Sequence, residues 1–178
     1  MLYLPEFPCE WALSRWSGRP HGLAIDPLGV ECFVAPPTPR RGLFGRRRSE
    51  PAPSLYLHVL VHNELSSDRI RSWARTQVAR LGVLATQPDA EGDTLNRLAE
   101  EESGRLVDRE WTPAEIVIDG VPRAGSAFLA EPQRWAAYVD LGADRIALVG
   151  RDLTLEAARL RTATADEARR IRTDALRV

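Results

Sequence analysis

The fold of this chain is decided by residues 114–149, which read AEIVIDGVPRAGSAFLAEPQRWAAYVDLGADRIALV. Four short apolar runs are separated by Gly, Pro and Asp, a pattern typical of an antiparallel meander. The last two runs predict a hairpin in which Leu141 pairs with Ile146. Because side chains alternate along a strand, one face of this hairpin is expected to be apolar. Its members are Trp135, Ala137, Val139, Leu141, Ile146 and Leu148.

This apolar face needs a partner, and the most regular helical pattern of the chain supplies one. Ser66 or Ser67 can cap a helix that runs to about Leu81. Gly82 follows as a suitable C-terminal stop. Apolar residues recur in this segment at helical spacing, and we expect them to cover the apolar face of the hairpin. The opposite face, expected to meet solvent, carries Arg134, Tyr138, Asp140 and Arg145.

Residues 54–63 predict a central strand, because both of its faces are largely apolar. Further on, Asp93 can cap a second helix that ends near Gly104, and Thr164 with Glu167 forms a capping box for a helix to about Leu176. Weaker patterns predict helical turns from Cys9, a hairpin over 23–34, a short strand at 83–85, an extended segment at 106–111 and a helix over 155–160.

These elements predict one α+β domain over residues 1–178, with a mostly antiparallel sheet, including the meander at about 114–149, packed against helices. The length of 178 residues suits a single core. A formal net charge of −1 gives no field that would attract nucleic acid or a membrane. All 24 basic residues are Arg, which indicates a GC-rich bacterial genome. The N-terminus has no signal-peptide pattern, so we expect a cytoplasmic protein with no membrane contact.

The strongest local charge lies in residues 36–53, where Pro and Gly interrupt any periodicity and predict a flexible loop. Five cations and Glu50 give this loop a balance of about +4. Such a loop is either merely solvated or binds phosphate, nucleic acid or an acidic protein face. The candidate ligand-binding residues are Arg40, Arg41, Arg46, Arg47 and Arg48.

A second candidate site is the segment that contains His58, His62 and Glu64. On a strand, residues four apart stand about 13 Å from each other, too far for one metal ion. His62 and Glu64 could share an ion only with a third ligand. Cys9 and Cys32 lie far apart in the sequence and near no histidine cluster. We therefore expect no metal, no cofactor and no catalytic residue identifiable from a motif.

Three functions follow from these patterns. The first is a non-enzymatic interaction or adaptor module that binds an acidic protein surface or a second copy of itself as a homodimer. The second is a phosphate or nucleic-acid binder that uses the Arg-rich loop at 40–48, which the near-neutral net charge disfavours. The third is an enzyme with a pocket near His58, His62 and Glu64. The sequence favours the first function over an enzyme.

Overall fold

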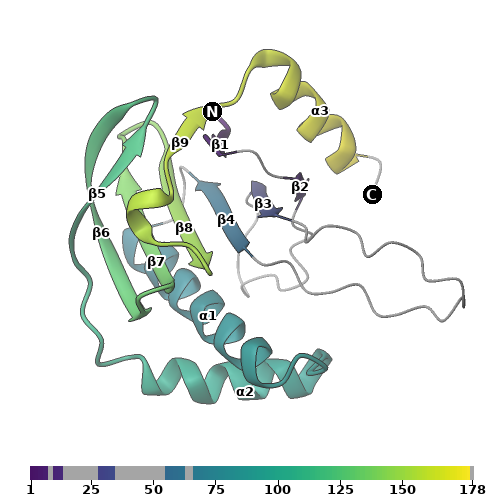
Figure 1. The fold of residues 1–178 in the computed structure, drawn as a ribbon, viewed down its shortest axis with the longest axis vertical. Coiled ribbons are helices and arrows are strands. Elements are labelled where there is room, and N and C mark those ends of the chain that lie inside the picture. The colour runs from purple at the N-terminus through teal and green to yellow at the C-terminus, as the bar shows by residue number, and fades with distance from the viewer. Residues whose placement is uncertain (8–9, 14–27, 35–54, 63–65, 177–178) are drawn as a thin grey trace, which may run out of the picture.

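A computed structural model describes residues 1–7, 10–13, 28–34, 55–62 and 66–176. Figure 1 shows that this part of the chain forms one α+β unit, in which helices pack against a single strongly curved sheet. The predicted fold class, a single domain with a mostly antiparallel sheet, is confirmed. The Arg-rich residues 36–53 lie outside the described residues.

Nine strands of the described residues form the sheet in the order β1-β9-β5-β6-β7-β8-β4-β3-β2. All neighbours pair antiparallel except β5 and β9, which are parallel. The meander is confirmed as four consecutive neighbours, β5 to β8. The bounds are β1 Tyr3–Pro5, β2 Glu10–Leu13, β3 Leu28–Val34, β4 Leu55–His62, β5 Thr112–Ile118, β6 Val121–Glu131, β7 Arg134–Asp140, β8 Arg145–Arg151 and β9 Leu160–Thr162.

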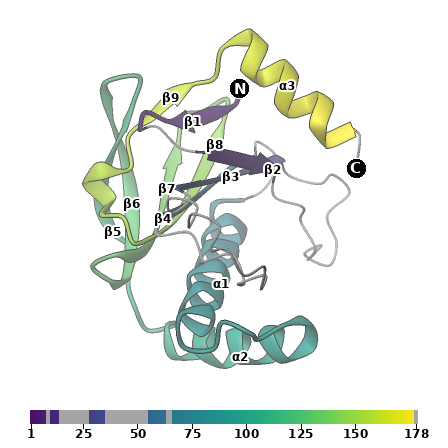
Figure 2. The ribbon, with the colours of Figure 1, turned by 45° about the vertical axis from the view of Figure 1, so that its right-hand side comes forward.

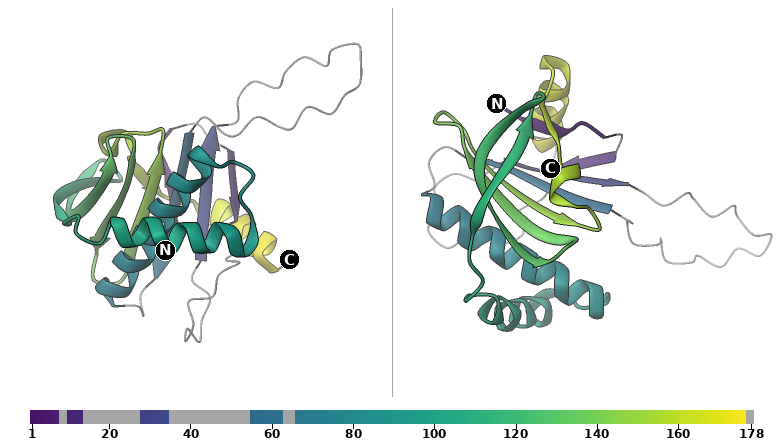
Figure 3. Two further views of the ribbon diagram at one scale, coloured as in Figure 1. Left: turned by 90° about the horizontal axis from the view of Figure 1, so that it is seen from below. Right: turned by 60° about the vertical axis from the view of Figure 1, so that its left-hand side comes forward.

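The sheet curls until β1, at one end of the strand order, lies near β3 and β4 toward the other end. Figure 3 shows the nearly closed shape that results. Its concave inner face is filled by Trp135, Val139, Ile146 and Leu148, which are all buried. Trp135 fits because Gly150, its partner on β8, has no side chain: a Cβ there would lie 2.5 Å from the indole ring.

The hairpin of β7 and β8 has the predicted inner face but not the predicted register. Val139, rather than Leu141, pairs with Ile146, a shift of two residues that leaves every side chain on its face. The cause is the turn. The Leu141 N–H donates to the Asp144 carbonyl, and Gly142 adopts a φ of 82°, so residues 141–144 leave the strands and close the loop.

Three helices are described: α1 Ser67–Thr86, α2 Gly92–Arg105 and α3 Ala165–Leu176. Figure 2 shows α1 across the convex side of the sheet, with α2 packed beside it. The prediction that α1 covers the Trp135 face was therefore wrong. It covers the opposite face, where Ala136 and Ala147 let it approach closely. Arg134 and Tyr138, predicted to face solvent, are buried there, at 9% and 5% exposure.

Several local predictions also need correction. The strand expected at 83–85 is instead the last turn of α1, which passes Gly82 and ends at Thr86. Residues 106–108 form a turn after α2, rather than the extended segment predicted there. Glu10–Leu13 is strand, not helix. The helix expected over 155–160 is one short 3-10 turn, Leu155–Ala157, followed by β9.

The capping box at the start of α3 is confirmed by its hydrogen bonds. The Glu167 N–H donates to Thr164 Oγ1 over 3.3 Å, and the Thr164 N–H donates to Glu167 Oε2 over 2.8 Å. Arg161 of β9 adds two charged hydrogen bonds to the same carboxylate. These bonds hold the pKa of Glu167 down at about 2. Ile171 of this helix reaches the inner core.

Candidate binding surface on the outer face of the sheet

The residues singled out by the sequence fall in different places. Arg40, Arg41, Arg46, Arg47 and Arg48 lie outside the described residues, as does Glu64. The predicted central strand is confirmed as β4, which lies between β8 and β3. The spacing of His58 and His62 is thus that of a strand. Among the described residues, no group of three or more His, Cys, Asp or Glu side chains is arranged to hold a metal ion.

His58 is buried between β4 and α1, at 3% exposure. Its ring meets the Trp73 ring edge to face, with 5.1 Å between ring centres. Burial lowers the pKa of His58 from the usual 6.5 to about 4, because the charged form would lose its water. A neutral, enclosed imidazole of this kind suits packing better than ligand binding at the surface.

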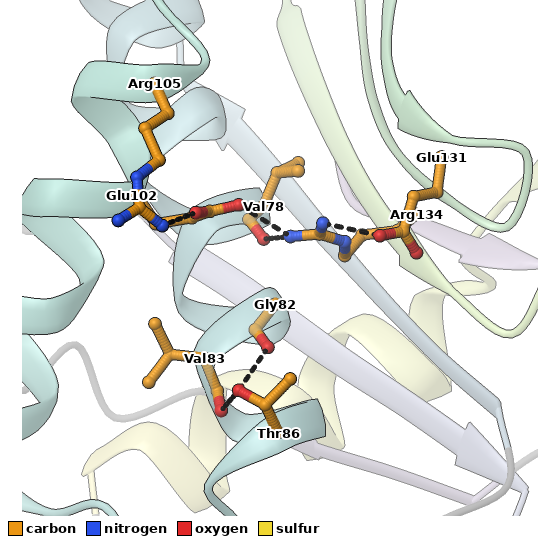
Figure 4. Close-up of polar contacts among 8 residues, drawn as sticks. All are labelled: Val78, Gly82, Val83, Thr86, Glu102, Arg105, Glu131 and Arg134. Carbon is orange, nitrogen blue, oxygen red and sulfur yellow. Dashed lines mark hydrogen bonds and ion pairs between the residues drawn. The ribbon is translucent and has the colours of Figure 1, made fainter.

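Among the arginines whose burial the structure describes, Arg134 is the most deeply buried. Figure 4 shows its contacts. Its Nη1 donates to the Val78 carbonyl of α1 over 3.2 Å and lies 3.8 Å from the Glu102 carboxylate of α2. Its Nη2 donates to Glu131 of β6 over 2.9 Å. The guanidinium lies directly over Gly82, where a Cβ would collide with it. Arg134 therefore joins both helices to the sheet and has a structural role.

Further along the outer face, Tyr138 links α1 to the end of the hairpin. Its hydroxyl lies 2.9 Å from Ser67 Oγ and donates to Asp140 over 3.3 Å. Asp140 also accepts hydrogen bonds from Arg145 and from the Gly142 N–H. The Gly142 bond and the Arg145 contact hold the pKa of Asp140 below its usual value. A fixed carboxylate and hydroxyl thus border this part of the face.

Beside Tyr138, two arginines of α1 lie on aromatic rings of the sheet. The Arg71 guanidinium carbon is 5.7 Å from the ring centre of Trp111 and 5.3 Å from that of Tyr138. The Arg75 carbon is 5.6 Å from the ring centre of Phe128. We call these five residues the arginine–aromatic cluster. Both arginines and Trp111 are half-buried, whereas the other two rings are buried.

Among the described residues, the two arginines of the cluster have no ion pair, whereas several other arginines do. Arg134, Arg145, Arg151, Arg159 and Arg161 each contact a carboxylate. In the described part of the chain, the only hydrogen bond of the cluster's arginines runs from Arg71 Nη2 to Ser126 Oγ over 3.3 Å. The Nε atoms of both are enclosed without an acceptor. The arrangement can therefore accept an anion.

The sequence alone did not reveal this cluster, because its members come from four separate parts of the chain. These parts are helix α1, the segment before β5, strand β6 and strand β7. Arg71 and Arg75 are four residues apart, which places them on the same helix face, and that signal was present in the sequence. The rings that receive them could not be identified, because helix α1 was assigned to the other face of the sheet.

Comparison of the chain with family models, with curated proteins and with solved structures finds no match. Each described helix is too short or too polar to span a membrane.

Proposed function

We propose that this protein is a non-enzymatic interaction module that binds a protein partner on the outer face of its sheet. The observation that carries the proposal is the arginine–aromatic cluster. Trp, Tyr and Arg are the residue types that dominate binding energy at protein interfaces, especially when rigidly held. Here the rings are fixed by the sheet, and the guanidinium groups of Arg71 and Arg75 are fixed by the rings.

The surroundings of the cluster support a protein partner over a small substrate. Val107, which is 59% exposed, lies in the segment that leads from α2 to Trp111. An exposed apolar side chain thus lies four residues from Trp111 of the cluster, a combination that suits a peptide segment. The burial of His58 weighs against the alternative of an enzyme pocket at His58, His62 and Glu64.

The proposed partner is acidic, because the two arginines of the cluster have no ion pair among the described residues. A second copy of this chain is one source of such a surface, since residues 89–110 hold eight acidic and three basic residues. Arg40, Arg41, Arg46, Arg47 and Arg48 are proposed to add attraction to the same partner. Binding of phosphate or nucleic acid by residues 40–48 remains the alternative.

We propose that the protein works in the cytoplasm of a bacterium.

Site-specific photocrosslinking tests this function in the cells that make the protein. A photoreactive amino acid at Val107 should give one discrete adduct, identified by mass spectrometry. The matched control at Val121, an exposed position (46%) at the start of β6, should not. Replacing both Arg71 and Arg75 by Gln should remove the Val107 adduct. Equal adducts from both positions, unaffected by the arginine changes, would show that this face is not an interface.

A further inference from the structure

We infer that Arg71 and Arg75 form an oxyanion-binding site whose occupant is a carboxylate from an acidic segment of a partner protein. This inference deepens the proposed function and rests on it. It goes further by naming the two binding groups and the chemical class that they bind.

The two guanidinium groups lie over neighbouring aromatic rings. Residues four apart on a helix lie on the same face, about 5–6 Å from each other. The rings beneath Arg71 and Arg75 are themselves neighbours, with 5.9 Å between the centres of Trp111 and Phe128. A guanidinium held over a ring by a cation–π contact still offers N–H groups to a ligand. Both arginines can therefore donate to one oxyanion while keeping their contacts with the rings.

The charges leave this position open for an anion. Two cations one helical turn apart repel each other, and their contacts in the described residues include no carboxylate. Only the Nε atoms are enclosed without an acceptor, so Arg71 Nη1 and both terminal nitrogens of Arg75, which have no hydrogen bond in the described residues, remain within reach of a ligand. A bound oxyanion would relieve the repulsion and replace water with charged hydrogen bonds.

A third group is available beside them. Ser126 Oγ accepts the hydrogen bond from Arg71 and keeps its own proton. Ser126 is a buried residue, at 9% exposure, and its hydroxyl lies beside the Arg71 guanidinium. A ligand oxygen between the two guanidinium groups could accept that proton. Ser67 and Tyr138 are less available, because their hydroxyl groups bond each other.

The local charge balance favours a carboxylate over a phosphate. Asp140 is linked to the cluster through Tyr138, and Glu110 is exposed next to Trp111 in the chain. These acids offset part of the positive charge, which suits a monoanion better than a phosphate dianion. Apolar side chains flanking a carboxylate on a peptide could also contact the exposed part of Trp111 and Val107.

The test observes the arginine Nε–H signals of the full chain by NMR. The probes are a capped hexaglutamate peptide, a hexaglutamine peptide of the same length, and inorganic phosphate. We expect hexaglutamate to shift the Arg71 and Arg75 signals with saturation and hexaglutamine to leave them unchanged. Arg71→Gln and Arg75→Gln should each weaken hexaglutamate binding by roughly tenfold, the loss of a charged hydrogen bond. Arg69→Gln, the same change at an exposed position of α1, is the matched control.

Several results would overturn the inference. Absence of saturable shifts with hexaglutamate would remove the site, and tighter binding of phosphate than of hexaglutamate would reject the carboxylate. Shifts that grow with protein concentration alone would overturn a separate partner protein as the occupant and would identify a second copy of this chain instead. If Arg46→Ala, Arg47→Ala and Arg48→Ala together abolish binding while Arg71→Gln and Arg75→Gln do not, the site is wrong although the interaction function stands.

Discussion

The two faces of the sheet are both covered, but by different chemistry. The inner face is filled almost entirely by apolar side chains from every part of the meander, with β1, β9 and α3 closing the open side. The outer face, under α1, mixes apolar residues with His58, Arg134 and Tyr138. Burial alone therefore does not distinguish the two faces. The inner face stabilises the fold by burying apolar side chains, and the outer face also does so by specific polar contacts.

The inner face should be the most sensitive to a change of volume. Leu148→Ala removes a side chain with 0% exposure from the middle of the curved sheet. We expect a loss of about 2–5 kcal/mol in the free energy of unfolding, because the closed sheet cannot collapse into the cavity. Urea denaturation measures it. Leu129→Ala, at a 44% exposed position of β6, is the control and should change stability by less than about 0.5 kcal/mol.

The outer face should instead show a dependence on pH through His58. Its pKa is lowered to about 4 in the fold, so below pH 6.5 the unfolded chain binds a proton that the folded chain does not. Stability should therefore fall as the pH drops from 6.5 to 4 and then level off, by up to roughly 3 kcal/mol. Unfolding of His58→Phe across this range should lack that component. Parallel curves for the two proteins would mean that His58 does not titrate as stated.

The contacts by which Arg134 joins α1 and α2 to the sheet provide a sharper test of specific contacts. Gly82→Ala places a Cβ against the guanidinium and should push it from the Val78 carbonyl. We expect a cost of about 1–3 kcal/mol, because a buried donor loses its acceptor. Gly104→Ala in α2 meets no neighbour within 4 Å and should be neutral or stabilising by up to about 1 kcal/mol. If thermal unfolding shows the same change in stability for Gly82→Ala and Gly104→Ala, the contacts of Arg134 do not hold the helices to the sheet.

The capping box of α3, away from both faces, should have the smallest effect of these four. Glu167 has its pKa lowered to about 2, so its contribution is present above pH 4.5 and is lost as the pH falls toward 2. Its side chain is 27% exposed and that of Arg161 38% exposed, so screening reduces this contribution to about 1 kcal/mol. Glu167→Gln should lose this amount at neutral pH and match the parent near pH 2. A constant difference at all pH values would exclude the charge effect.

Much of the fold could be predicted because it depends on local patterns. Alternation placed Trp135, Val139 and Leu148 together, and the Thr164 and Glu167 pair marked the start of α3. The register of the hairpin could not be predicted, since it depends on the φ of Gly142 and the turn hydrogen bond. The length of α1 could not be predicted either. Gly82 suggested a helix end, but the helix continues through it, and the absence of a side chain there leaves space for the Arg134 guanidinium.

The candidate site was harder to predict than the fold for a physical reason. Alternation marks Arg134 and Tyr138 as one face, and polar residues usually indicate solvent, yet partners from α1 and α2 allow both to be buried. The rings under Arg71 and Arg75 were not predicted for the same reason, because this face was expected to meet solvent rather than α1. Which face a helix covers depends on long-range packing, and the small residues Ala136 and Ala147 indicate it only once the sheet order is known.

The central claim, that Arg71 and Arg75 serve binding rather than the fold, is tested most directly by urea denaturation of the Arg71→Gln, Arg75→Gln double variant. Loss of three ring contacts should be partly offset by relief of charge repulsion, so we predict a change below about 1 kcal/mol. The free energy of unfolding would then stay close to that of the parent protein. A loss as large as that of Leu148→Ala, about 2–5 kcal/mol, would contradict the claim and make both arginines part of the core.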